Sequence, residues 1–311
     1  MGILSESWNN KMPSNAATPK FFYGWWITGA AFLNLFFSVG LVYYGLPVYY
    51  PAMIAALGFS RAQLTQGFLI GFLIVGVPAS LLAGVLIDRF GARWVILSGV
   101  GLIGVPLILM GSITHLWQYE ALCMMEVFGY ALAGPIANQV LVSKWFHVRR
   151  GQAMGYVYLG LGLGGVVSPM LANFLIHQFG WRMALHSIGI AALVVLFPVG
   201  FFVTRSTPGE LGLLPDGADP ASTPVADARA AAPREVAGAF RTLDFWLILV
   251  GSTLVLSAIH AVIQHFILFL RDQHYALGSA SRILSTLLTV SLAGRVLVGY
   301  MADRLDRKSV V

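Results

Sequence analysis

The sequence predicts an all-α polytopic membrane protein, and three observations support this fold class. Hydrophobic residues make up 58% of the 311 residues and charged residues 10%, with a mean hydropathy of +0.78, whereas a soluble domain carries about 25% charged residues. Several apolar runs reach the roughly 20 residues that a helix needs to cross a hydrocarbon core. One short charged motif also occurs twice, each time after such a run.

Eight apolar runs are predicted to span the membrane. They cover residues 24–54, 64–87, 94–113, 117–143, 151–177, 184–204, 245–270 and 281–302. The polar residues 1–20 lack the apolar core of a cleavable signal and are expected to form a cytoplasmic tail. Pro47 and Pro51 should kink the outer half of the first span, because proline lacks the helical N–H donor.

The chain is predicted to divide into two membrane parts. Residues 206–243 are rich in Ala, Pro and Asp and show no apolar helical stripe, so they are expected to form a cytoplasmic linker. Residues 21–205 then form a six-helix N-terminal half, and residues 244–311 form a partial C-terminal half with two helices.

The basic residues predict the orientation. Short cytoplasmic loops hold an excess of Lys and Arg. With the N-terminus inside, fourteen basic residues fall on the cytoplasmic side, and the external side keeps only Arg61, Arg182, Arg271 and Arg282. We therefore expect a multi-pass protein of the cell (inner or plasma) membrane. Basic loops next to anionic lipid account for a pI of about 9.6 without a nucleic-acid partner.

The repeated motif reads "GVLIDRFGARW" at 84–94 and "GYMADRLDRK" at 299–308, with Gly, Asp and Arg recurring 215 residues apart. It resembles the Gly-x-x-x-Asp-Arg-x-Gly-x-Arg loop after the second helix in the major facilitator superfamily of secondary transporters. The first copy fits through Gly84, Asp88, Arg89, Gly91 and Arg93, and the second through Gly299, Asp303, Arg304 and Lys308, with Asp306 where Gly is usual. The resemblance covers the whole chain.

The motif has a physical interpretation. Gly84 would allow two helices to approach closely, and Asp88 at a helix C-terminus needs nearby cations, which Arg89 and Arg93 can supply. The resemblance implies that this cluster latches the two halves together on the cytoplasmic side during transport. The alternative is that these residues only anchor the loop on the positive side of the membrane.

Three further stretches resemble the monocarboxylate and oxalate/formate transporter branch: "KWFHVRRGQAMGYVYLGLGLGG" (144–165), "TPGELGLLPDG" (207–217) and "YGWW" (23–26). The resemblance implies transport of small organic anions, mono- or dicarboxylates, by alternating access. Gly155, Gly164 and Ser168-Pro169 form a degraded version of an antiporter motif. Its alternative is a stripe for close helix packing built from the pairs Gly151/Gly155 and Gly160/Gly164, so symport and antiport both stay open.

Arg295 is the candidate for substrate binding. It lies eight residues before Asp303, about 12 Å from the cytoplasmic end and close to the membrane midplane. No acid stands within one helical turn, and a guanidinium presents a planar fork that suits a carboxylate. The resemblance implies that this arginine binds the carboxylate of the substrate. The alternative is a structural ion pair with an acid elsewhere, such as Glu126.

Other polar residues in the spans are candidates for the same site, because ionisable groups in the bilayer are functional by default. For Glu126 a proton site, an ion-pair partner and a cavity-facing residue remain open. Tyr43 and Tyr44 are candidates for lining a cavity, whereas Tyr49 and Tyr50 fit an interfacial aromatic belt. His260 and Gln264 share a helix face; buried core histidines are the alternative for His260.

The sequence contains no metal-ligand set and no nucleophile with a base, so we expect no enzyme, metal or cofactor. The expected partners are a small anionic solute, protons and lipid, and the oligomeric state stays open. Since the resemblance implies twelve helices and the chain stops at Val311, we also expect a truncated sequence that does not transport by itself. The alternatives are a transporter for another solute, such as a drug or a sugar derivative, and a non-transporting membrane sensor or scaffold.

Overall fold

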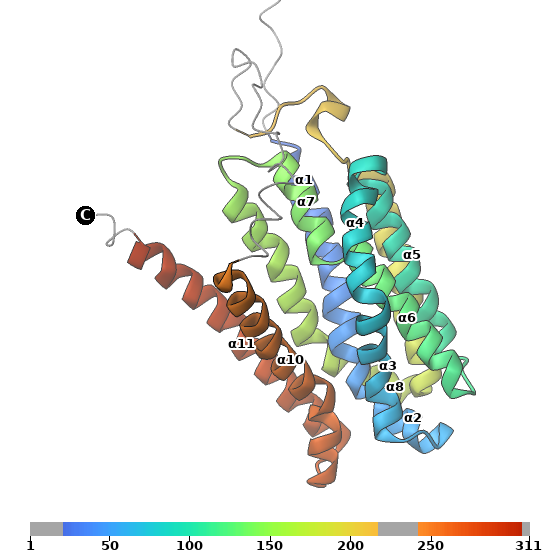
Figure 1. Cartoon of the computed structure of the whole chain (residues 1–311). Helices are drawn as coiled ribbons and strands as arrows, with labels where there is room; N and C mark the ends of the chain where they lie inside the picture. Colours follow the sequence, from blue (N-terminus) through green and yellow to red (C-terminus); the bar gives the residue numbers. More distant parts are fainter. Residues whose placement is uncertain (1–20, 217–241, 307–311) are drawn as a thin grey trace, which may run out of the picture.

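The computed structural model describes residues 21–216 and 242–306, without the side chains of Val77, Leu249, Leu256 and residues 295–306. Helices α1 to α8 lie side by side in a long bundle, and α10 and α11 form a pair beside it (Figure 1). The strongest packing joins α5 to α6, α5 to α8, and α8 to the π-helical segment Phe36–Tyr43. All-helical architecture follows from the apolar runs, because a helix satisfies every backbone hydrogen bond within its own segment.

Five helices of the described residues are long and apolar enough to cross a membrane, or six when a bent pair is counted as one span. The bent pair joins α3 (Arg61–Gly71) and the π-helical Phe72–Gly76 to α4 (Val77–Phe90). The others include α5 (Ala92–Met110) and α10 (Leu243–Asp272). The eighth expected span falls in α11 (Leu277–Asp306).

The longest helical stretch, Arg150–Val203, contains two expected spans. It comprises α8 (Arg150–Pro198) and the π-helical Val199–Val203, 54 residues in all, and a straight helix of that length would reach about 80 Å. Gly180 interrupts it with a φ of 77°, a conformation that favours glycine. The break lies between the predicted spans 151–177 and 184–204.

The first span is not one continuous helix. α1 (Gly24–Leu35) passes into the π-helical segment Phe36–Tyr43, then a short 3₁₀ turn (Leu46–Val48) and α2 (Tyr50–Leu57). The helix type changes at the two prolines: Pro47 lies in the 3₁₀ turn, and Pro51 lies in the first turn of α2.

The fourth expected span, 117–143, is broken, which the sequence analysis did not predict. α6 (Leu116–Ala133) ends at Gly134, and Pro135 begins α7 (Pro135–Trp145). The break frees backbone carbonyls that asparagines then bind: Asn138 Nδ2 donates to Ala133 O and Gly134 O at 2.8 Å each, and Asn34 Nδ2 donates to Ala133 O at 2.7 Å. Buried amides therefore satisfy the carbonyls at the break.

The expected linker, 206–243, begins with a folded segment. Thr207 and Glu210 cap a 3₁₀ helix, Pro208–Leu211, and the Asp216 carboxylate accepts hydrogen bonds from the backbone N–H groups of His147 and Arg149. An anion beside the N-terminus of α8 is favourable, because free N–H groups point outward there. Residues 217–241 of the expected linker lie outside the described residues.

Close helix packing is found at one of the two glycine pairs that the sequence analysis named in α8. A Cβ atom built on Gly164 would meet the Phe36 carbonyl oxygen and lie 2.7 Å from Gly40 Cα, and one on Gly160 would meet the backbone of Phe32. At Gly151 and Gly155 the same atom would meet nothing within 4 Å. The pair Gly160/Gly164 therefore permits backbone contact with the first span, whereas the pair Gly151/Gly155 lies at an open surface.

Candidate functional site

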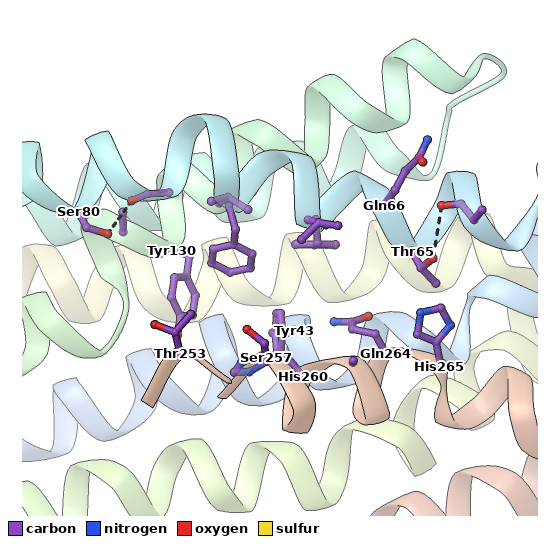
Figure 2. Close-up of a pocket in the computed structure, with 18 of the residues that line it drawn as sticks. Tyr43, Thr65, Gln66, Ser80, Tyr130, Thr253, Ser257, His260, Gln264 and His265 are labelled. Carbon is purple, nitrogen blue, oxygen red and sulfur yellow. Dashed lines mark hydrogen bonds between the residues drawn. The ribbon is translucent and has the colours of Figure 1, made fainter. Parts of the chain in front are cut away.

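A cavity of about 890 Å³ lies between the α1–α8 bundle and α10. Figure 2 shows α10 side chains on one side, facing residues of the bundle on the other. The lining residues are Tyr43, Ala62, Thr65, Gln66, Phe68, Leu69, Phe72, Gly76, Ser80, Leu81, Val127, Tyr130, Ala131, Thr253, Ser257, His260, Ala261, Gln264 and His265.

Helix α10 supplies a polar wall. Thr253, Ser257, His260 and Gln264 follow one another at intervals of four, three and four residues, which places them on one helix face. The sequence analysis identified His260 and Gln264 but missed Thr253 and Ser257. The same helical spacing could have identified them, because the four residues form one polar stripe in an apolar helix.

Gln264 is held in one orientation by Tyr50. The Tyr50 hydroxyl donates to Gln264 Oε1 over 3.0 Å, with Tyr50 0% and Gln264 8% exposed. Gln264 Nε2 has no hydrogen-bond partner among the described residues. The interfacial assignment of Tyr49 and Tyr50 is therefore wrong: α2 begins inside the bundle, and both rings are fully buried.

Only one of the two candidate tyrosines on the first span lines the cavity. Tyr43 lies on the cavity wall, with its ring 5.6 Å from the His260 ring (centroid to centroid). Tyr44 is not among the lining residues. Its ring packs edge-to-face on Tyr43 and against Gly165, where a Cβ atom would lie 3.1 Å from Tyr44 Cδ2.

Glu126 lies behind the cavity wall. The residue is 3% exposed, and neither carboxylate oxygen has a hydrogen-bond partner in the described part of the chain. It borders a separate void of about 10 Å³, while Tyr43, Val127 and Tyr130 line both this void and the large cavity. The cavity-facing alternative for Glu126 is therefore not supported.

Gly299, Asp303 and Arg304 of the second motif copy belong to α11. The side chains of Arg295, Gly299, Asp303 and Arg304 lie outside the described part, and Lys308 lies outside the described residues altogether. One helical turn before Arg295, Leu292 packs on Gly162 of α8, where a Cβ atom would lie 3.3 Å from Leu292 Cγ. This contact places the turn before Arg295 against α8.

The first motif copy differs from expectation in two respects. A Cβ atom on Gly84 would meet nothing within 4 Å among the described residues, so the close helix approach expected there is not found. Asp88 forms no ion pair in the described chain. Arg93 donates to the Phe201 carbonyl, and its guanidinium lies 5.1 Å from the ring centroids of Trp94 and Phe201.

Gly91 forms the turn between Asp88 in α4 and Arg93 in α5. Gly91 ends α4 with a φ of 82°, and the chain then enters α5, where the Arg93 N–H donates to Ser206 Oγ over 3.1 Å. The turn directs Arg93 toward residues 201–206. Arg89 and Asp88 remain exposed at the end of α4.

Replacing Gly91 by alanine should destabilise the fold by about 1–2 kcal/mol, because an L-residue in this backbone region is strained. A Cβ atom there would also lie 2.6 Å from Ser206 Oγ. The matched control is Gly84→Ala in the preceding helix, which meets open space and should be neutral or slightly stabilising. Thermal unfolding of both variants in detergent measures the difference. Equal melting temperatures would contradict the assigned role of Gly91.

An ion pair joins the predicted external ends of the two parts. Arg61, the first residue of α3, binds the carboxylate of Asp272, the last residue of α10, through Nη1–Oδ2 and Nη2–Oδ1 contacts. The sequence analysis treated Arg61 only as an external charge. The partners stand 211 residues apart, so no local pattern could have paired them.

Residues 18–311 match the sequence family described as Major Facilitator Superfamily. The MFS-type transporter pytF of Aspergillus terreus is 26% identical over 229 residues, covering 73% of this chain and 71% of the relative. The membrane sensor protein UhpC of Escherichia coli is 27% identical over 168 residues, which cover 52% of this chain and 37% of UhpC. The structure of a bacterial homologue of the human lysosomal transporter Spinster, in an inward-facing, unoccupied conformation, matches this chain with a TM-score of 0.66 at 18% identity. The match covers 92% of this chain and 63% of the homologue.

Proposed function

Because this chain belongs to the Major Facilitator Superfamily, we propose that it forms the solute-binding part of a secondary transporter that moves small organic anions by alternating access. The observation that carries the proposal is the cavity, since both the α1–α8 bundle and α10 line it. Membrane transporters place their solute between such repeats, and the repeats rock about that site. The proposed location is the inner or plasma membrane, with the N-terminus in the cytoplasm.

The side chains of the described lining support an anionic solute, namely a mono- or dicarboxylate. The described lining contains no Asp or Glu, and it contains two imidazoles, His260 and His265. An organic cation would therefore lack a counter-charge there, whereas a carboxylate can accept hydrogen bonds from imidazole and amide N–H groups. In this proposal Arg295 supplies the main counter-charge, with Tyr43, His260 and Gln264 around the solute.

Glu126 is the proposed proton site. An unpaired carboxylate buried in an apolar setting favours its neutral form, and Glu126 has no hydrogen-bond partner among the described residues. Proton release would leave a charge directly behind the Tyr43 and Tyr130 rings. The first motif copy, including Asp88 and Arg89, is the proposed cytoplasmic gate.

A membrane sensor is the second candidate, because UhpC carries that name and resembles half of this chain. The two functions make different predictions about flux. A transporter moves the bound solute across the membrane, whereas a sensor binds it without moving it.

The variant Gln264→Glu tests whether the solute in the cavity is an anion. Glutamate has nearly the shape of glutamine and keeps an oxygen for the Tyr50 hydroxyl. At an alkaline pH, where this acid ionises, it adds a negative charge to the cavity wall. Carboxylate affinity should fall about ten-fold or more, since a charge-assisted contact contributes about 1.5–3 kcal/mol. The control is Gln152→Glu, an exposed position of α8 outside the lining.

Binding of radiolabelled mono- and dicarboxylates would be measured on the chain in proteoliposomes, with protein-free liposomes as blank. Uptake would be measured on a twelve-helix form, since the chain by itself is not expected to transport. Unchanged carboxylate affinity in Gln264→Glu would exclude an anion at this site. Carboxylate binding without uptake would favour the sensor.

A further inference from the structure

The bundle side of the cavity is built from aromatic rings. Tyr43 stands at the centre, with ring centroids 6.0 Å from Phe68, 6.5 Å from Phe72 and 6.5 Å from Tyr130. Phe72 and Tyr130 pack edge-to-face on one another at 5.8 Å. These residues come from three separate segments, so the wall exists only in the folded protein.

The rings differ in how far they reach the cavity. Tyr43 and Phe68 are each 7% exposed and form the back of the wall. Phe72 and Tyr130 are half-buried and also line the cavity, and in Figure 2 the Tyr130 ring points toward Thr253 of α10. A solute in the cavity therefore has part of two ring surfaces available for contact.

The opposite wall is polar. Thr253, Ser257, His260 and Gln264 face these rings from α10. A solute that fits both walls carries a flat apolar part on one side and hydrogen-bond acceptors on the other. Aromatic rings prefer edge-to-face or offset partners at centroid separations of about 4.5–7 Å, a preference that adds to the burial of area.

We propose that the preferred solute carries an aromatic ring next to its carboxylate, and that Phe72 and Tyr130 bind this ring while α10 faces the polar end. The inference rests on the proposed function for the carboxylate and on the ring cluster for the aromatic part. Aromatic carboxylates of the benzoate type are the class of solute.

The alternative occupant of an aromatic wall is an organic cation, because ring faces attract positive charge. Two features oppose it. The described lining contains no acid, and Glu126 lies behind Tyr43, Phe72 and Tyr130 in its own void. A cation in the cavity would have the ring cluster between itself and that carboxyl group.

Isothermal titration calorimetry on the chain in lipid nanodiscs tests the inference with four probes. Benzoate and cyclohexanecarboxylate have the same number of carbons and the same charge but differ in aromaticity. Benzyl alcohol keeps the ring without the charge, and benzyltrimethylammonium reverses the charge. Benzoate should bind about two- to ten-fold more tightly than cyclohexanecarboxylate.

The variants Phe72→Leu and Tyr130→Leu should remove this preference while leaving cyclohexanecarboxylate binding within about two-fold. Phe197→Leu is the matched control: Phe197 is a 48% exposed aromatic residue of α8 outside the lining, and the preference should persist. A preference that survives the double variant Phe72→Leu/Tyr130→Leu would overturn the assignment.

The outcomes separate this inference from the proposed function. Equal affinities for benzoate and cyclohexanecarboxylate would overturn the aromatic inference and leave the anion transporter in place. If benzyl alcohol binds as tightly as benzoate, the proposal of an anionic solute is overturned, and the proposed contact of the solute ring with Phe72 and Tyr130 is retained. Tightest binding of benzyltrimethylammonium, or no binding of any probe, would overturn both.

Discussion

Replacing Arg295 by lysine should lower the affinity for a carboxylate about ten-fold or more. The change keeps the positive charge but loses the planar fork that binds both carboxylate oxygens. A charge-assisted contact contributes about 1.5–3 kcal/mol, and each 1.4 kcal/mol corresponds to about ten-fold in affinity. Arg282→Lys, at an exposed position near the start of the same helix, is the matched control and should bind normally.

The expected result depends on which anion neutralises Arg295. A buried unpaired cation costs several kcal/mol, so some anion has to compensate it. When that anion is the solute, Arg295→Lys reaches the membrane in normal amounts and loses affinity. When it is Glu126, Arg295→Ala destabilises the fold and Glu126→Gln partly restores it.

Two sets of measurements distinguish the two cases, for Arg295→Lys and for Arg295→Ala with and without Glu126→Gln. Carboxylate affinity and protein abundance are measured on the chain, and carboxylate uptake is measured on a twelve-helix form. Unchanged affinity in the lysine variant would remove Arg295 from the binding site. Restored stability in the double variant would assign the arginine to an ion pair. Normal transport without Arg295 would favour another class of solute.

The substitution Gly164→Ala should destabilise the protein by about 1–3 kcal/mol, the usual cost of inserting a methyl group into a packed contact. The atoms that the new Cβ would meet are the Phe36 carbonyl oxygen and the Gly40 backbone. Because they belong to the main chain, no side-chain rotation relieves the clash. The first span would therefore have to move away from α8. Tyr43 lies on this span and would move with it.

Gly155→Ala is the control for this prediction, since it lies nine residues earlier in the same helix and meets nothing within 4 Å. Alanine there should be neutral or mildly stabilising, because glycine is the poorer helix former. Thermal unfolding in detergent micelles measures both variants. A Gly164→Ala protein as stable as Gly155→Ala would show that the two helices are not held at backbone contact.

The membrane class, the helical fold and the motif were predictable from the sequence, because each depends on local chemistry. Apolar runs identify helices, since backbone groups in lipid must bond within their own segment. The change of helix type at Pro47 and Pro51 has a similarly local reason, because proline lacks the helical N–H donor. The pairing of Gly160 and Gly164 was predicted together with the pair Gly151/Gly155, which proved to be exposed; spacing alone does not show which helix face meets a neighbour.

Which residues line the cavity could be seen only in the tertiary structure. Tyr50 looked like an interfacial residue, yet its hydroxyl binds Gln264, 214 residues away, and the two become neighbours only when α10 packs on the bundle. The aromatic wall likewise joins Tyr43, Phe72 and Tyr130 from three segments. Sequence periodicity reports which residues share a face of one helix. Which faces then meet depends on how several helices pack at once, and that packing brings together rings and polar groups with no common sequence pattern.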